Sequence, residues 1–219
     1  MPPRRVGKGA TEDGRRETEL KLEDVVPWGR SKAEYVRMFA LTERDLLLGR
    51  ILDCAGGPAS FNAEATGEGA SVVSCDPVYR FAAEEIAGRI EETRETIVAG
   101  AKANRERYVW DEMGSAKRMG EVRMAAMRRF LEDFPRGLAE GRYLADGLPA
   151  LRFAAGEFDL ALCSHFLFTY SGLLTMDFHV VAIEEMCRVA KEARVVRAAS
   201  NPLVQEGGLP EACRGGEKS

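Results

Sequence analysis

The residues best suited to chemistry are polar or sharply turning groups that directly follow short apolar runs at four places in the chain. They are Asp53 with Ala55, Gly56 and Gly57; Asp76 with Pro77; Asp146 with Gly147; and Ser164 with His165. A carboxylate can accept hydrogen bonds from paired hydroxyl groups, a glycine loop lets a ligand approach the backbone, and a histidine can move a proton. One acid after a strand is often only a turn residue or helix cap, but four such sites in succession predict a ligand-binding site.

The runs before these groups have the pattern of buried strands, and helical periodicity separates them. The predicted strands are 50–54 (RILDC), 70–75 (ASVVSC), 141–145 (GRYLA), 158–163 (FDLALC) and 193–199 (ARVVRAA). The predicted helices are 31–41, 42–48, 60–66 and 177–191, with further helices between 81 and 140. This alternation predicts an α/β fold with a doubly wound, mostly parallel sheet covered by helices on both faces. Ligands of such sheets bind at the carboxyl ends of the strands, where all four groups are expected.

Residues 81–140 carry only helix signals, which is more than one crossover between strands requires. The region therefore predicts a helical insertion, and two interpretations stay open: a lid beside the site, or an amphipathic helix that packs on the sheet. Its second half mixes basic and acidic residues, which favours a solvated helix face over a site for an acidic substrate. The basic residues are Arg118, Arg123, Arg128, Arg129 and Arg136, and the acidic ones are Glu121, Glu132 and Asp133.

The segment before the first strand contains aromatic residues whose role is open. Trp28, Tyr35 and Phe39 are expected either to cover a ligand or to anchor the N-terminal helix to the core. Residues 1–26 and 200–219 have the composition of disordered tails, so the predicted domain spans 27–199.

Composition sets limits on the function. The chain has 219 residues, 45% of them hydrophobic and 30% charged, which suits one globular domain. A net charge of −4 argues against a nucleic-acid or anionic-membrane partner. No apolar run approaches the ~20 residues that span a bilayer, so we expect a cytoplasmic protein.

The five cysteines are scattered and form no C-x-x-C pair, which is typical of reduced thiols. Cys54, Cys75 and Cys163 end neighbouring predicted strands and are expected to converge. Buried cysteines usually act as small hydrophobes, and no second cluster of ligands accompanies these three, so a metal site is disfavoured.

Physical chemistry favours a nucleoside as the ligand. A carboxylate at the end of the second strand, about 20 residues past a glycine loop, can accept hydrogen bonds from both ribose hydroxyls. Asp76 has this position.

Over residues 50–197 the sequence resembles the class I S-adenosylmethionine-dependent methyltransferases, a Rossmann-like family. The family's first motif, acid-x-Gly-x-Gly-x-Gly, corresponds here to residues 53–59 (DCAGGPA), with alanine at two glycine positions. Residues 148–168 (LPALRFAAGEFDLALCSHFLF) are similar to the family's segment around the fourth strand. The resemblance implies a sheet of order 3-2-1-4-5 and S-adenosyl-L-methionine as cofactor.

The resemblance also implies roles for the site residues. Asp146 would accept from the adenine amino group with Leu148 against the ring, while Asp53 and Gly57 would hold the amino-acid part of the cofactor. The remaining cofactor-binding candidates are Ala55, Gly56, Pro77 and Ser164, beside Asp76 at the ribose.

Methyl transfer gains most of its rate from proximity and desolvation, so no fixed catalytic triad is expected. For a hydroxyl or amine acceptor, His165 is the candidate catalytic base, followed by His179. The acidic charge balance favours a small-molecule acceptor.

A nicotinamide-dependent oxidoreductase is disfavoured because Gly-x-Gly-x-x-Gly is absent, whereas a degenerate methyltransferase fold serving as a binding or regulatory module stays open.

The family usually completes its sheet with a C-terminal hairpin, and the end of this chain (SNPLVQEGGLPEACRGGEKS) has no alternating apolar run to form one. The fifth strand is therefore expected to be an exposed edge, which predicts either marginal solubility or a homodimer formed through that edge.

Overall fold

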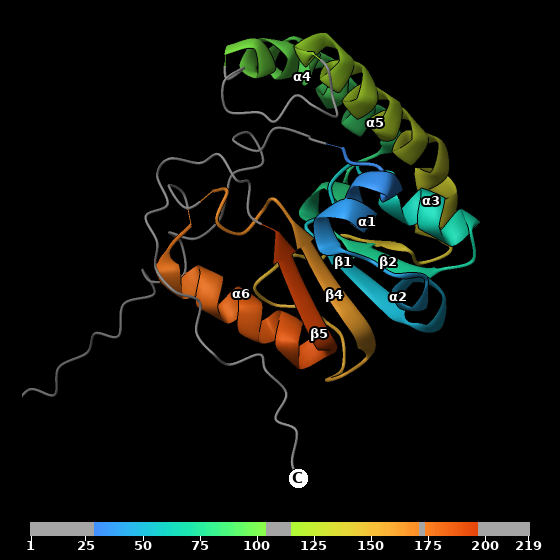
Figure 1. Cartoon of the computed structure of the whole chain (residues 1–219), viewed down its shortest axis with the longest axis vertical. Helices are drawn as coiled ribbons and strands as arrows, with labels where there is room; N and C mark the ends of the chain where they lie inside the picture. The colour runs from blue at the N-terminus through green and yellow to red at the C-terminus, as the bar shows by residue number, and fades with distance from the viewer. Residues whose placement is uncertain (1–28, 104–114, 171–173, 197–219) are drawn as a thin grey trace, which may run out of the picture.

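In the computed structural model, residues 29–103, 115–170 and 174–196 are described, and they contain one five-stranded, wholly parallel sheet (Figure 1). The strands are β1 (Arg50–Cys54), β2 (Ser71–Cys75), β3 (Tyr143–Leu144), β4 (Phe158–Ser164) and β5 (Ala190–Val196). Their order is β3-β2-β1-β4-β5. The predicted Rossmann-like α/β fold and sheet order are confirmed.

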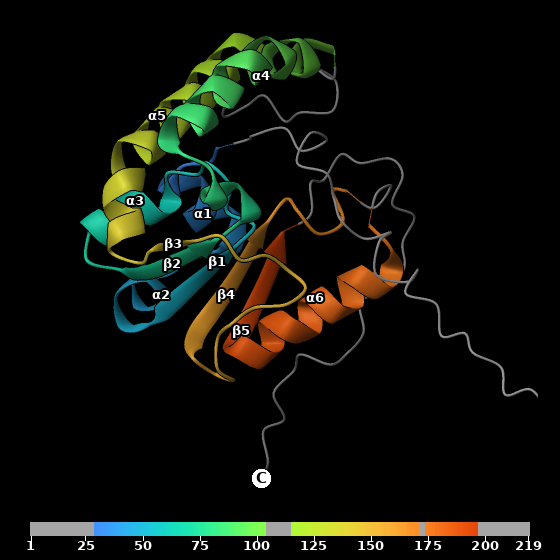
Figure 2. The ribbon, with the colours of Figure 1, turned by 180° about the vertical axis from the view of Figure 1, so that it is seen from behind.

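Helices cover both faces of the sheet, as Figures 1 and 2 show together. The helices are α1 (Lys32–Phe39), α2 (Glu43–Leu48), α3 (Phe61–Gly67), α4 (Ala83–Ala103), α5 (Ala116–Ala139) and α6 (Met176–Val189), with a 3-10 turn, η3, at Pro77–Arg80. Ser31 and Thr42 begin α1 and α2 with capping boxes, in which Glu34 and Asp45 reach back to the cap backbone. None of the helices in the described part of the chain has an apolar stretch long enough to cross a membrane.

Strand alternation decides which way each side chain of β1 points. Ile51 packs in the cluster formed with α1 and α3, whereas Leu52 and Cys54 pack in the cluster formed with α6. Asp53, between Leu52 and Cys54, is therefore directed to the same face as α1 and α3.

The helical insertion is confirmed as α4 and α5, which pack side by side. The second half of α5 also packs on α3 and β3, and Met127, Phe130 and Phe134 join Tyr143 in a buried aromatic cluster. This half of α5 is therefore an amphipathic helix that packs against the sheet.

The structure corrects three details of the predicted elements. Helix α6 ends at Val189 and β5 begins at Ala190, not at residue 193, because Ala190 already pairs with Phe158 of β4. Val181 lies on the solvent side of α6 and is 46% exposed, although its spacing predicts an apolar position. The third strand has only two residues. The predicted tails, residues 197–199 and the C-terminal segment that is predicted to lack the family's hairpin all lie outside the described residues.

Most of the charged residues that predict a solvated face on α5 are exposed, but Arg123 is an exception. Its side chain is only 2% exposed and forms an ion pair with Glu34 of α1, whose side chain is also buried. Arg123 also donates to the carbonyl oxygen of Gly29 at 3.3 Å. The arginine lies four residues before Met127, on the apolar stripe of the helix, which is why it is buried. Asp133 is likewise buried.

We predict that Arg123→Met strongly destabilises the fold, by roughly 3–5 kcal/mol, because it leaves the Glu34 carboxylate buried without this cation. The free energy of unfolding in urea measures the effect. The double variant Arg123→Met/Glu34→Gln should recover much of the loss. Equal losses in the single and double variants would contradict a buried ion pair between α1 and α5.

Candidate functional site

The loop after β1 is fastened to the end of β2 by backbone and side-chain hydrogen bonds. The N–H of Ala55 donates to the carbonyl oxygen of Cys75 at 2.8 Å. The N–H of Gly57 donates to Asp76 Oδ2 at 2.9 Å, and the Tyr79 hydroxyl donates to the carbonyl oxygen of Gly57 at 2.7 Å. Gly57 has a φ of +53°, where glycine carries no steric cost.

The two adjacent glycines of this loop face different surroundings. A Cβ on Gly56 would lie 2.3 Å from Asp53 Oδ2, so the inner side of the loop has no room for a side chain. A Cβ on Gly57 would meet only Asp76 Oδ2, at 3.8 Å. The loop thus packs closely on Asp53 and is open beside Asp76.

Asp53 lies beneath the loop and is 1% exposed. Its Oδ1 accepts from the Tyr35 hydroxyl and its Oδ2 from Ser74 Oγ, both at 2.9 Å. Burial raises the pKa of this carboxyl to about 7, with a smaller contribution from the charge of Asp76. Asp53 is expected to hold part of a ligand, but both of its carboxylate oxygens already accept hydrogen bonds from protein hydroxyls. This arrangement supports the loop.

Asp76 directly follows β2 and accepts from two backbone N–H groups. Besides Gly57, Val78 donates to its Oδ1 at 2.8 Å, and Pro77 opens the 3-10 turn that places Val78 there. Burial raises the pKa of the Asp76 carboxyl to about 6. Each carboxylate oxygen can accept a second hydrogen bond, so this group can also bind ligand hydroxyls.

The ends of β2 and β3 lie against each other. A Cβ on Gly147 would be 2.9 Å from Pro77 Cγ, so the absence of a side chain allows this close approach. Asp146 forms an ion pair with the exposed Arg152, and Arg152 Nη2 lies 2.5 Å from Asp146 Oδ1. Leu148 is partly buried against the cluster on the α6 face. The structure brings Asp146 and Leu148 close to Pro77, but the Asp146 carboxylate is engaged by arginine.

Ser164 is the last residue of β4, the strand that pairs with β1 on the side opposite β2, and His165 follows it. Ser164 Oγ and His165 Nδ1 are hydrogen-bonded at 3.1 Å, and the His165 N–H donates to the carbonyl oxygen of Val196 at 3.2 Å. Burial and the charges of Arg30 and Arg123 lower the pKa of His165 to about 3. The imidazole is therefore neutral at physiological pH and is a weak base.

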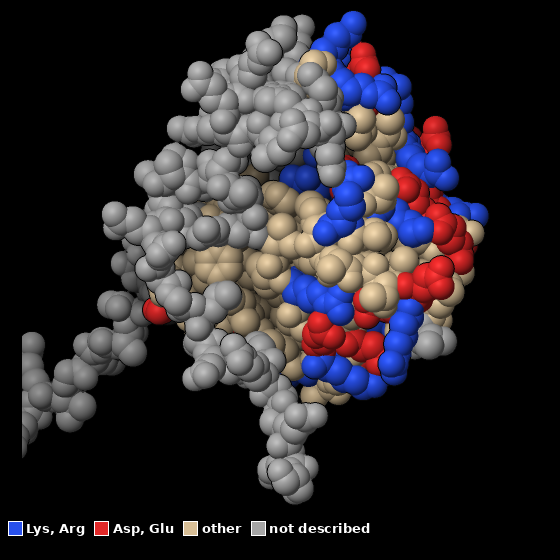
Figure 3. Space-filling model, in the orientation of Figure 1, with Lys and Arg blue, Asp and Glu red and all other residues tan. Residues whose placement is uncertain are grey.

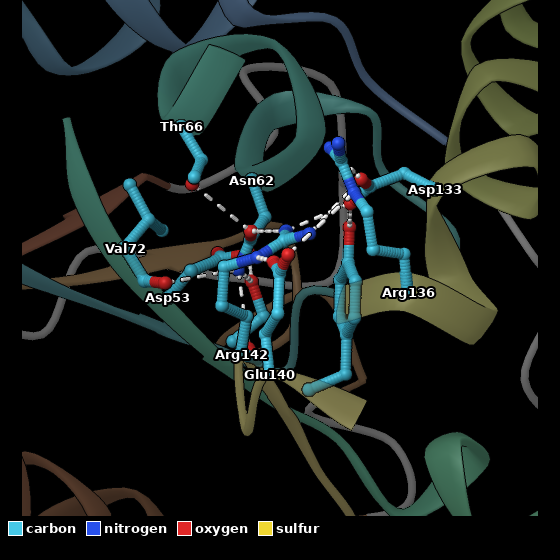
Figure 4. A network of polar contacts seen from close by, with 10 residues as sticks. Asp53, Asn62, Thr66, Val72, Asp133, Arg136, Glu140 and Arg142 are labelled. Atoms are coloured by element: carbon cyan, nitrogen blue, oxygen red, sulfur yellow. Dashed lines mark hydrogen bonds and ion pairs between the residues drawn. The ribbon is translucent and has the colours of Figure 1, made fainter. Parts of the chain in front are cut away.

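A polar network missed in the sequence connects Asp53 to α5 (Figure 4). Ser74 Oγ accepts from Asn62 Nδ2 at 3.1 Å, and Asn62 Oδ1 accepts from Arg142 Nη1 at 2.7 Å. Arg142 donates to both oxygens of Asp133 at 2.7 and 2.9 Å. The apolar periodicity around these residues gives no signal for buried polar partners that lie far apart in the chain.

Helix α1 is anchored over the loop by aromatic packing. The Tyr35 ring stacks on Phe61 of α3 with centroids 4.2 Å apart, and Phe39 is also buried. These two side chains fit the anchoring alternative. Trp28 lies outside the described residues.

The three cysteines converge as expected. Cys54 is in register with Cys75 on one side and with Cys163 on the other, and all three are buried. Burial raises the pKa of Cys163 to about 12, which keeps the thiol protonated. Within residues 29–103, 115–170 and 174–196, no group of His, Cys, Asp and Glu side chains is arranged to hold a metal ion.

The surface seen in Figure 3 has no large region of one charge over α2, α3 and α5. Lys and Arg side chains alternate there with Asp and Glu. This face thus lacks the basic stripe that typically binds nucleic acid.

Comparison with known proteins places the chain in a family. It is 33% identical over 177 residues to uncharacterized protein MJ0045 of Methanocaldococcus jannaschii, a match that covers 80% of this chain and 79% of the relative. The chain therefore belongs to the same family as that archaeal protein. No protein-family model matches the sequence, and no solved structure matches it.

We predict that Asp53→Asn changes how stability depends on pH. With its pKa raised to about 7, Asp53 keeps its proton in the folded state where the unfolded chain has lost it. The group therefore stabilises the fold below pH ~4, and this stability, on the order of 2–4 kcal/mol, is lost as pH rises to about 7. Urea unfolding of wild type and Asp53→Asn should show their difference falling over this range.

The matched control is Asp159→Asn. Lys191 and the Arg50 backbone N–H lower the pKa of this exposed carboxyl, so its contribution should be lost as pH falls. A pH-independent difference between wild type and Asp53→Asn would contradict the raised pKa of Asp53.

Proposed function

We propose that this protein is a class I S-adenosylmethionine-dependent methyltransferase acting on a small-molecule acceptor. The observation that carries the proposal is the contact between the glycine loop and Asp76, with the open side of Gly57 next to the carboxylate. The contact lies at the carboxyl edge of the sheet, where β1 is central. This is where α/β sheets bind nucleotides.

The residues around this contact fit the parts of such a cofactor. Asp76 would accept from the ribose hydroxyls, and Leu148 would lie against the adenine with Asp146 at its amino group. The chain from Ala55 to Gly57 would hold the amino-acid end. Ser164 and Pro77 would border the site. The carboxylates of Asp53, which is buried, and of Asp76, which is partly exposed, favour a cation such as a sulfonium over an anion.

The cofactor would supply an activated methyl group, and the protein would supply position and a dry environment. His165, kept neutral by burial, would hold the acceptor by a hydrogen bond and accept its proton only weakly. This favours an acceptor atom that needs little help from a base.

The expected dimer through the edge of β5 stays a proposal.

Calorimetric titration with S-adenosylmethionine, S-adenosylhomocysteine and NADH tests the assignment. We expect micromolar binding of the first two and none of NADH. Absence of binding to a folded sample would overturn the methyltransferase proposal and favour a degenerate methyltransferase fold that serves as a binding or regulatory module. Binding of NADH alone would favour the oxidoreductase class.

We predict that Asp76→Asn weakens S-adenosylhomocysteine binding by about 10- to 100-fold, because hydrogen bonds to a charged group contribute roughly 1.5–3 kcal/mol. Glu132→Gln, an exposed change on α5, is the matched control and should bind like wild type. Thermal unfolding checks that both variants are folded. Unchanged affinity in Asp76→Asn would remove this residue from the site.

A further inference from the structure

His179 is a buried histidine that the cofactor site does not use. It lies in the first turn of α6 and is 4% exposed. In the described part of the chain, neither ring nitrogen has a hydrogen-bond partner, although both are covered. Buried polar atoms are nearly always paired, and leaving them unpaired destabilises a fold, so these two nitrogens mark a place where a polar group from outside the chain can bind.

The surroundings of His179 are aromatic. Its ring stacks on Phe168, with centroids 4.9 Å apart and planes 16° apart, and meets Phe178 edge-on. Phe166 contacts Phe178 in the same way, with centroids 6.1 Å apart. Flat apolar rings thus pack on the imidazole of His179, a combination that suits a planar ligand with a polar group.

This aromatic cluster continues directly from the candidate site. The segment that carries Phe166 and Phe168 begins at His165, at the carboxyl end of β4, and β4 pairs with β1. His165 and Phe168 both have a positive φ, 55° and 66°, which is costly for residues other than glycine. Such backbone strain is concentrated at functional sites.

The protonation state of His179 limits what it can bind. Burial lowers its pKa, so the imidazole is neutral and presents one N–H donor and one acceptor nitrogen. A hydroxyl or amino group can donate to the acceptor nitrogen or accept from the N–H, a carboxylate can only accept from the N–H, and a hydrocarbon can do neither.

We propose that residues 165–170, directly after β4, and the first turn of α6 bind the methyl acceptor, a planar ring with a hydroxyl or amino group, and that His179 makes the hydrogen bond to that group. The inference rests on the proposed function, because it names the acceptor class for the same site. Since both nitrogens are covered, entry of the ring requires a neighbouring side chain to turn away, and Phe168 is the ring packed on the imidazole.

Phenol and toluene are the probes that test this, because they have nearly the same shape and differ in the hydroxyl group. We expect wild type to bind phenol about tenfold more tightly than toluene by calorimetry, since only phenol can form a hydrogen bond with one of the buried nitrogens. Binding should also shift the ¹⁵N resonances of the His179 imidazole. His179→Phe should bind both probes alike, and His179→Gln, which keeps a donor and an acceptor, should retain part of the preference.

His179→Phe also separates a ligand contact from a structural role. Removal of two unpaired polar atoms should leave the unfolding temperature unchanged or raise it. A less stable His179→Phe that still prefers phenol, or a wild type that binds both probes equally, would overturn the inference. Binding of S-adenosylmethionine without the phenol preference would contradict this inference alone, whereas the preference without cofactor binding would support the ring site and contradict the methyltransferase proposal.

Discussion

The buried carboxylate of Asp53 is the constraint on which the site depends. No lysine, arginine or histidine of the described residues forms an ion pair with it, and two hydroxyl groups satisfy it instead. A buried carboxylate destabilises the fold unless it is hydrogen-bonded, so the groups that contact Asp53 must keep their positions. Tyr35 must reach in from α1, Ser74 must face the same side of β2, and Gly56 must have no side chain. The glycine loop therefore has one conformation, with its open side next to Asp76.

The same carboxylate ties the site to the helical insertion. Ser74 accepts a hydrogen bond from Asn62 of α3. Arg142 donates both to Asn62 and to Asp133 on α5. On the other side of the site, the ion pair of Arg123 with Glu34 joins α5 to α1. The inserted helix is thus a structural support of the site through buried polar contacts, and a change in α5 can alter the loop without touching it.

Much of the fold follows from local patterns. The runs RILDC and FDLALC define their strands to within one residue, and two capping pairs locate the starts of α1 and α2. Alternation along β1 also determines that Asp53 faces α1 and α3. The partners on that face are not predictable in this way, because Tyr35 and Ser74 meet Asp53 through the tertiary fold. The charge of Arg123 predicts an exposed side chain, whereas its position on the apolar stripe of α5 buries it. The α6–β5 junction was misplaced because no breaker residue separates the helix from the strand.

A crystal structure of the protein with S-adenosylhomocysteine tests the central claim most directly. We expect the ribose hydroxyls within hydrogen-bond distance of the Asp76 carboxylate, with the adenine beside Leu148 and the glycine loop unmoved over Asp53. A nucleoside bound away from Asp76, or a loop that must refold to admit it, would contradict the proposal that this carboxylate and this loop form a cofactor site.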